Sequence, residues 1–138
     1  MFTGTFRHQL DEKGRVRIPV GFRKELGANV KMYVHVADCL MVYPEKDYAN
    51  VVEKRFKDID ILDLDMEEQR RLIFSRTQDG EVDKQGRVLL NTNLAKLVGI
   101  ERNIVSIGAM DHVEIWDEAT FDKYMAELDE RIGRTKKK

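Results

Sequence analysis

The sequence has few of the residues that build disulfides, nucleophilic sites or metal centres. Cys39 is the only cysteine, so no disulfide can form within the chain, which agrees with a reducing compartment. The two serines, Ser75 and Ser106, lie outside any Gly-x-Ser-x-Gly motif, so no acyl-transfer site is visible. Metal-site spacing is also lacking among the three histidines, His8, His35 and His112. We therefore expect no enzyme activity, no small-molecule substrate, no metal and no cofactor.

Long apolar runs are absent as well. No stretch of 18 apolar residues could cross a membrane, and the opening residues 1–5 lack the apolar segment of a signal peptide. We therefore expect a cytoplasmic protein without a membrane partner. With 138 residues, 42% of them hydrophobic, the chain can form one ordinary domain or two small ones that share a core.

The net charge of the chain is close to zero, although charged residues are numerous. The chain has 24 Lys and Arg against 25 Asp and Glu, for a net charge of −1, but the charges are segregated. Residues 1–37 carry seven bases and three acids, whereas residues 38–72 carry six bases and ten acids. A locally basic surface can bind phosphates despite a neutral total, because binding follows the local potential. The charge pattern therefore leaves nucleic acid open as a partner.

The chain contains an internal repeat. Shifting residues 10–27 by 72 positions gives six identities in 18, the pairs being Asp11/Asp83, Gly14/Gly86, Arg15/Arg87, Val16/Val88, Lys24/Lys96 and Gly27/Gly99. Such self-similarity predicts two copies of one structural unit. We expect a first module at 1–58, a linker with a helix at 59–74 and a second module at 75–138, with the two modules sharing one core.

Each half has the same order of expected elements. In the first half we expect a β-hairpin of strands 5–10 and 15–18 and then a short helix at 19–27. Two further strands at 30–36 and 39–43 follow, and an amphipathic helix starts after Pro44. The second half repeats them with strands at 88–90, 104–107 and 113–116, a helical turn that ends at Gly99 and a helix from about Glu118. Asp65 is expected to cap the linker helix. The result is a mainly β protein with packed helices, an α+β barrel-like body with a pseudo-twofold axis.

The first turn concentrates positive charge. We expect Asp11 and Gly14 to form the turn, as Asp83 and Gly86 do in the second half. Lys13 lies at the tip of the first turn. Arg15 and Arg17 share one face of a strand, and Arg7 is expected to face them from the neighbouring strand. A two-stranded ribbon fits the DNA major groove, where arginine can bind guanine and lysine can neutralise phosphate.

The motif Asp11-x-x-Gly14-Arg15-x-x-x-Pro19, repeated as Asp83-x-x-Gly86-Arg87, resembles the AbrB-type modules of the MraZ family of bacterial transcriptional regulators. The resemblance extends to the Met1-Phe2-x-Gly4 start, to Leu40-Met41-Val42-Tyr43-Pro44 and to Val113-Glu114-Ile115-Trp116. It implies a double-split β-barrel of two swapped-hairpin modules that assembles into a homo-oligomeric ring. It also implies a nucleoid-associated repressor that binds tandem promoter repeats upstream of a division and cell-wall gene cluster. By the same resemblance, Arg15 and Arg87 are expected to take the DNA-facing role, with Lys13 and Lys84 beside them.

The second copy departs from the first at the basic positions. It has Asp79 for Arg7, Gln85 for Lys13, Leu89 for Arg17, Asn91 for Pro19 and Ala95 for Arg23. The second hairpin therefore either contacts DNA more weakly or mainly completes the barrel, and we expect Arg15 to matter more than Arg87. The alternative function is an interaction or antitoxin-type module that binds a protein through its acidic helices. An enzyme acting on anionic substrates would need a converging acid-base site, which the sequence does not show.

Overall fold

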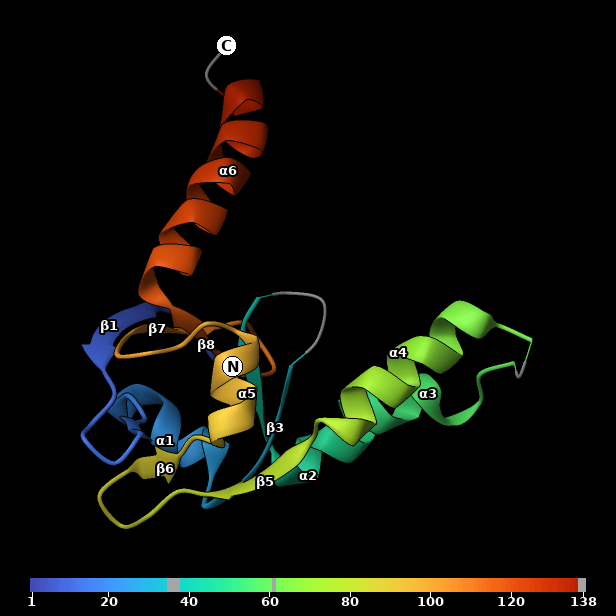
Figure 1. Cartoon of the computed structure of the whole chain (residues 1–138), viewed down its shortest axis with the longest axis horizontal. Helices are drawn as coiled ribbons and strands as arrows, with labels where there is room; N and C mark the ends of the chain where they lie inside the picture. The colour runs from blue at the N-terminus through green and yellow to red at the C-terminus, as the bar shows by residue number, and fades with distance from the viewer. Residues whose placement is uncertain (35–37, 61, 137–138) are drawn as a thin grey trace.

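Six strands form one antiparallel sheet in the order β1-β7-β8-β4-β3-β5 (Figure 1). The computed structural model describes residues 1–34, 38–60 and 62–136. The strands of the large sheet are β1 (Thr5–Gln9), β3 (Asn29–Val34), β4 (Leu40–Pro44), β5 (Gln78–Glu81), β7 (Asn103–Gly108) and β8 (Val113–Asp117). A separate two-stranded sheet, called the ribbon below, consists of β2 (Arg15–Arg17) and β6 (Arg87–Leu89). With the helices, these sheets make a mixed α+β fold, as predicted.

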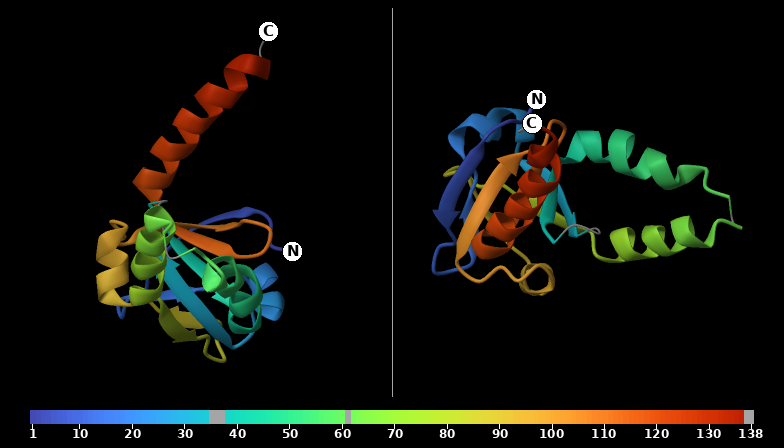
Figure 2. Two further views of the ribbon diagram at one scale, coloured as in Figure 1. Left: turned by 90° about the vertical axis from the view of Figure 1, so that its right-hand side faces the viewer. Right: turned by 90° about the horizontal axis from the view of Figure 1, so that it is seen from above.

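The helices lie on both sides of the large sheet and beyond it. They are α1 (Val20–Leu26), α2 (Glu45–Tyr48), the π-helical η1 (Ala49–Glu53), α3 (Lys54–Lys57), α4 (Leu64–Ser75), α5 (Thr92–Leu97) and α6 (Glu118–Lys136). The continuous segment α2–η1–α3 and the returning α4 form a helical hairpin that projects from the sheet, while α6 extends in another direction (Figures 1 and 2). None of the helices in the described ranges has the length and apolar character that a membrane crossing requires.

The expected hairpin between residues 5–10 and 15–18 is wrong. The Asp11–Gly14 turn closes, since the Gly14 N–H donates to the Asp11 carbonyl at 3.0 Å, but the strands on either side of it diverge. β1 pairs with β7, and β2 pairs with β6, so both strands take their partner from the other half of the chain. Strands this short bury little apolar surface as an isolated hairpin, and pairing across the halves joins both of them to the shared core.

The strand pairings are symmetric with respect to the internal repeat. Replacing each residue by its equivalent in the other half gives the same set of strand pairs. In the ribbon the central pair is Val16 with Val88, the equivalent residues of the two copies. In the large sheet Met41 lies opposite Glu114, again an equivalent pair. The outer pairings match too, because β1 with β7 is equivalent to β5 with β3, and each joins a strand of one half to a strand of the other. Both halves therefore contribute equally to one body.

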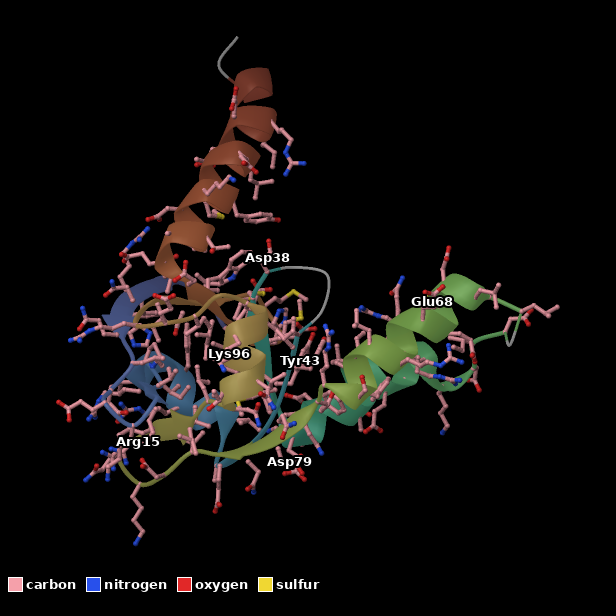
Figure 3. The ribbon with its side chains drawn as sticks, in the orientation of Figure 1. Arg15, Asp38, Tyr43, Glu68, Asp79 and Lys96 are labelled. Atoms are coloured by element: carbon pink, nitrogen blue, oxygen red, sulfur yellow. The ribbon has the colours of Figure 1, made fainter. Side chains whose placement is uncertain are left out.

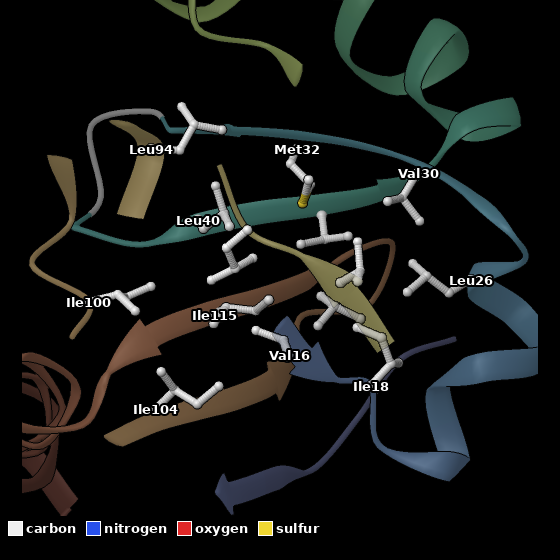
Figure 4. Packing of buried hydrophobic residues seen from close by; sticks show 14 of the residues in the cluster. Val16, Ile18, Leu26, Val30, Met32, Leu40, Leu94, Ile100, Ile104 and Ile115 are labelled. Carbon is white, nitrogen blue, oxygen red and sulfur yellow. The ribbon is translucent and has the colours of Figure 1, made fainter. Parts of the chain in front are cut away.

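The main core lies between one face of the large sheet and the inner face of the ribbon, with α1 and α5 at its sides. Figure 4 shows Val16 beside Ile115 in this space, with Ile18 and Ile104 to either side of them. Val16, Ile18, Ile104 and Ile115 are fully buried. The ribbon is thus fixed to the body by its apolar inner side chains.

The opposite face of the sheet packs against the long helices. Tyr48 packs against Tyr33 and Tyr43 of the sheet, and Phe56 packs against Phe74 of α4. Tyr48, Val52 and Phe56 are all buried in one cluster, which confirms the predicted apolar face of the helix after Pro44. In α6 the predicted apolar face is covered only at its start. Phe121 is buried beside Trp116, whereas Ile132 is 50% exposed.

Local signals predicted the element ends with mixed success. The short helix between Pro19 and Gly27 is confirmed, with Gly27 at a φ of +76°. The expected cap at Asp65 is wrong, because α4 begins at Leu64 and the capping residue is Asp63, whose carboxylate accepts from the Met66 N–H at 3.2 Å. β3 ends at Val34, and the end of the predicted strand, His35 and Val36, lies outside the described residues. β5 was not predicted, since Gln78–Glu81 has no apolar pattern.

A half-buried polar cluster lies at the start of β8. The His112 ring lies 2.6 Å from Asp111 and 2.8 Å from Glu114, and it stacks on Tyr43. Glu114 also accepts from the Trp116 indole at 3.0 Å. Burial alone would lower the pKa of His112, but hydrogen bonds to the two carboxylates outweigh burial and raise the pKa above its ordinary value.

Core packing predicts a strong contrast between two isoleucines. Replacing the fully buried Ile115 by alanine should lower the free energy of unfolding by about 2–5 kcal/mol, because it leaves a cavity. The same substitution at the half-exposed Ile132 should change it by less than about 0.5 kcal/mol. Urea denaturation of both variants at one protein concentration measures the difference, and equal losses would contradict the described core.

The raised pKa of His112 predicts a pH-dependent contribution to stability. The protonated ring is favoured in the folded state, so its contribution is complete below the unfolded pKa of about 6.5 and is lost as the pH rises through the folded pKa. The loss of unfolding free energy caused by His112→Gln should therefore be larger at about pH 5.5 than at about pH 8.5. Urea unfolding at both pH values measures it.

His8 provides a control of opposite sign. Burial lowers the pKa of His8, whose ring lies 2.7 Å from the Ser106 hydroxyl. Its contribution should be present above the unfolded pKa and lost as the pH falls, so His8→Gln should cost more at the higher pH. If the loss of unfolding free energy changed with pH in the same direction for His8→Gln and His112→Gln, the opposite pKa shifts assigned to the two histidines would be wrong.

Candidate nucleic-acid interface

The outer face of the ribbon carries three arginines and one leucine. Val16 and Val88 point into the core, so by strand alternation Arg15, Arg17, Arg87 and Leu89 point away from it. Arg17 lies directly opposite Arg87, and Arg15 lies opposite Leu89. The ribbon therefore brings predicted site residues from both halves onto one small surface.

Side chains on this face are close together. The Leu90 N–H donates to the Gly14 carbonyl at 3.2 Å, and the Ile18 N–H donates to the Gly86 carbonyl at 2.7 Å. Hydrogen-bonded pairs alternate with non-hydrogen-bonded pairs along an antiparallel ladder, so the Arg15/Leu89 and Arg17/Arg87 pairs are of the second, closer type. Two guanidinium groups face each other at one end of the ribbon, an arrangement that favours an anionic ligand.

The turns before β2 and β6 are built alike. The Asp11 carboxylate accepts from the Lys13 and Arg15 N–H groups at 2.9 Å and from Arg15 Nε at 2.7 Å. Hydrogen bonds from Arg15, the backbone one first, hold the pKa of Asp11 below its ordinary value. Gly14 has a φ of +76°, in the region that glycine tolerates best.

In the second turn, Asp83 accepts from the Gln85 and Arg87 N–H groups at 2.9 Å and from Arg87 Nε at 3.1 Å. The Arg87 N–H is the largest cause of the lowered pKa of Asp83. Gly86 has a φ of +79°. Each turn thus fixes the backbone of the following strand and one guanidinium group.

Each Asp–Arg pair fixes the orientation of the arginine side chain and leaves most of its N–H donors free to bind a ligand. A guanidinium has five N–H donors, and with Nε bonded to the aspartate the two terminal amino groups remain for a ligand. The side chains of Arg15 and Arg87 are 26% and 24% exposed. Figure 3 shows Arg15 at the ribbon side of the molecule, away from Glu68 on the helical hairpin. Both groups are held in place and open to bidentate contacts.

Arg17 and the lysines differ from this pair. The Arg17 Nη1 donates to the Gln85 carbonyl at 3.2 Å, and no carboxylate of the described residues forms an ion pair with it. Lys13 and Lys84 are exposed in the two turns, at opposite ends of the ribbon. A surface pocket between the first turn and the ribbon is lined by Gln9, Asp11, Glu12, Lys13, Arg15, Arg17 and Arg87.

Arg7 lies elsewhere, so its predicted position opposite Arg15 and Arg17 is wrong. Because β1 pairs with β7, Arg7 reaches the start of α6, where it binds Asp122 at 2.8 Å and Glu118 at 3.4 Å. The guanidinium also lies 5.9 Å from the centre of the Phe121 ring. Arg7 joins the sheet to α6 and has its charge matched there.

Arg23 was not among the residues predicted for the site, but it contacts the second turn. Its Nε donates to the Ile18 carbonyl at 2.8 Å, and its guanidinium lies where a side chain on Gly86 would begin, 2.3 Å from that Cβ position. At the equivalent Gly14 nothing lies within 4 Å. The sequence offered one indication that Arg23 has a specific role, because the second copy has Ala95 at the equivalent position.

No group of three or more potential metal ligands occurs within the described ranges. Cys39 is buried, and burial raises the pKa of its thiol, so it is not an activated nucleophile. The arrangement of the ribbon suits reversible binding of an anionic surface, with charge from both halves of the chain.

The fold and the ribbon define a protein of two intertwined repeats with one shared basic surface. The family model described as "MraZ protein, putative antitoxin-like" matches residues 1–68 and 73–138, so the chain belongs to the MraZ family, as its sequence indicated. Proteins named transcriptional regulator MraZ are similar over most of the chain. Those of Desulforamulus reducens and Natranaerobius thermophilus are each 36% identical over 94% of this chain and 90% of their own length. That of Acetivibrio thermocellus is 35% identical over 90% of this chain and 86% of its own.

The two turn glycines predict an unequal response to the same substitution. Gly14→Ala should lower the free energy of unfolding by about 1–2 kcal/mol, because alanine disfavours a positive φ. Gly86→Ala should cost more, because the new methyl group also displaces the Arg23 guanidinium from its bond to Ile18. In an Arg23→Ala background the two glycine substitutions should cost the same. Urea denaturation of the double-mutant cycle measures this, and a difference that persists without Arg23 would contradict the contact.

Proposed function

We propose that this protein is a sequence-specific DNA-binding transcriptional repressor without enzyme activity, and that its ribbon enters the major groove of duplex DNA. The observation that carries the proposal is the outer face of the ribbon, where Arg15, Arg17 and Arg87 from the two halves lie together. The names of the relatives agree with a role in transcription.

The dimensions of the ribbon fit this role. From the Gly14/Leu90 pair to the Ile18/Gly86 pair it spans four residue steps, or about 13 Å. Its two strands lie about 4.8 Å apart, and the major groove, about 12 Å wide, admits such a two-stranded ribbon. In that position the terminal amino groups of Arg15 and Arg87 can bind guanine O6 and N7, and Lys13 and Lys84 at the two ends can reach phosphates.

Both halves act at one DNA site in this proposal. Arg87 lies opposite Arg17 rather than on a distant second hairpin, so a ligand that reaches one guanidinium also reaches the other. Phosphate oxygens or base edges would relieve the repulsion between them. We therefore propose contacts from Arg15, Arg17, Arg87, Lys13 and Lys84, and none from Arg7, whose charge is matched at α6.

The proposal extends to the assembly. We propose that modules 1–58 and 75–138, joined by the linker 59–74, form a double-split β-barrel with pseudo-twofold symmetry, supported by the pairings that survive exchange of the halves. One ribbon offers few contacts, so useful affinity needs several copies acting on repeated sites. We therefore propose a homo-oligomeric ring, associated with the nucleoid in the cytoplasm, that binds tandem promoter repeats upstream of a division and cell-wall gene cluster.

A second candidate function is an antitoxin-type interaction module. Its support is the tip of the helical hairpin, where Leu62 and Leu64 are 83% and 69% exposed next to Asp60, Asp63 and Asp65. The family description also contains the term "antitoxin-like". Such a module would bind a basic protein through the tip and would not need the ribbon.

Charge removal on the ribbon distinguishes the two candidates. Arg17→Ala should weaken binding to the promoter DNA upstream of the protein's own gene and reduce the slope of log affinity against log salt by about 1, because one cation is lost. Arg15→Ala should also reduce the preference for this DNA over unrelated duplex. Fluorescence anisotropy at several salt concentrations measures both effects.

Arg71→Ala is the matched control, because it removes an equally charged, exposed side chain from α4. It should leave binding and salt slope unchanged, and Arg7→Ala should behave in the same way. If Arg17→Ala and Arg15→Ala bound as wild type does, the ribbon would not be the DNA-binding surface and the interaction module would be favoured.

A further inference from the structure

Leu89 is the one apolar side chain among the four that the ribbon's outer face presents. It is 61% exposed, and its neighbours on this face are Arg15, Arg17 and Arg87. The face therefore has two unlike ends, with two arginines facing each other at one end and an arginine facing a leucine at the other.

We propose that Leu89 is a base-specificity residue that contacts the C5-methyl group of a thymine next to the base pair bound by Arg15. The inference rests on the proposed function, since it assumes that the ribbon lies in the major groove. It adds a second kind of chemical recognition, an apolar contact, to the charge contacts of the arginines.

The register of the ribbon brings the two side chains to adjacent bases. Arg15 and Leu89 are a directly opposed pair of the closer, non-hydrogen-bonded type, with Cα atoms about 4.5 Å apart. That spacing is close to one base-pair step, about 3.4 Å along the helix axis. A guanidinium bound to one base pair therefore leaves Leu89 over the next.

The chemistry of the groove selects the partner. Leucine donates and accepts no hydrogen bond, so in the groove it gains free energy only by covering an apolar group. Among the base edges in the major groove, the thymine methyl is the apolar group on offer. An arginine at this position could bind either guanine or a phosphate, whereas leucine can cover only the thymine methyl group.

The internal repeat supplies a second argument. Exchanging the halves turns the Arg15/Leu89 pair into the Arg87/Arg17 pair, so Leu89 occupies the position that holds Arg17 in the first copy. The position is therefore one that faces the ligand in both copies, and the two copies differ in what they can contact there. The unlike ends also give the ribbon a polarity, so it can lie across an asymmetric site in only one direction.

The first experiment identifies the bases that each residue selects. Wild type, Leu89→Ala and Arg15→Ala are each used to select duplexes from a randomised DNA pool, and the selected sequences are compared. Wild type should enrich a thymine beside a guanine. Leu89→Ala should keep the guanine and lose the thymine, and Arg15→Ala should lose the guanine. Leu62→Ala, which truncates an equally apolar and 83% exposed leucine at the hairpin tip, should select as wild type does.

The second experiment tests the methyl group itself. Replacing that thymine by deoxyuridine in the wild-type-selected duplex removes one methyl group, which should weaken wild-type binding about three- to five-fold. The same replacement should not affect Leu89→Ala, because the contact is already lost. Leu89→Arg should bind with a salt slope steeper by about 1, because it adds one cation, and should be insensitive to the replacement.

The outcomes separate this inference from the function on which it rests. If Arg15→Ala binds and selects as wild type does, the proposed function fails and the inference fails with it. If Arg15→Ala fails to select while deoxyuridine leaves wild-type affinity unchanged, the function stands and Leu89 does not read thymine. A methyl effect of equal size in wild type and Leu89→Ala would likewise overturn the assignment.

Discussion

The pairing of Val16 with Val88 is the contact on which the rest of the structure depends. It joins equivalent strands of the two halves into one ribbon and seals the core between that ribbon and the large sheet. Strand alternation then decides the outer surface, because burying the two valines turns Arg15, Arg17, Arg87 and Leu89 outward. Neither half can form this surface alone. The same hydrophobic constraint that holds the halves together therefore creates the candidate DNA-binding site.

Duplication followed by divergence explains the charge pattern of the molecule. The two turns kept the aspartate, glycine and arginine that fix the backbone and one guanidinium each. Around them the copies differ: Arg23 reaches the second turn while its counterpart Ala95 leaves the first turn open, and Leu89 stands where the first copy has Arg17. A nearly symmetric backbone thus carries an asymmetric set of contacts. Residues 38–72, with ten acids against six bases, offset the excess of bases in residues 1–37, which is why the net charge of −1 gave no indication of the ribbon.

Local features of this fold could be predicted from the sequence, and long-range pairing could not. Turn residues, the short helix between Pro19 and Gly27 and the apolar face of the helix after Pro44 follow from spacing within a few residues. The pairing partner of each strand cannot be predicted in this way, because a repeat offers two equivalent partners and the local sequence pattern cannot choose between them. This is why the expected hairpin was wrong and why Arg7 lies against α6 rather than beside Arg15. The basic residues of the first turn were found from composition, but the meeting of Arg17 with Arg87 depends on the exchange of strands.

The most direct test of the account is an NMR titration that follows the arginine side-chain Nε–H signals as promoter duplex is added to the ¹⁵N-labelled protein. The account predicts that the signals of Arg15, Arg17 and Arg87 shift together, at the same DNA concentration, because one ligand covers one ribbon. The signals of Arg70 and Arg71 on α4 should remain where they are. Shifts confined to α4, with a silent ribbon, would contradict the central claim that the two halves build a single DNA-binding surface.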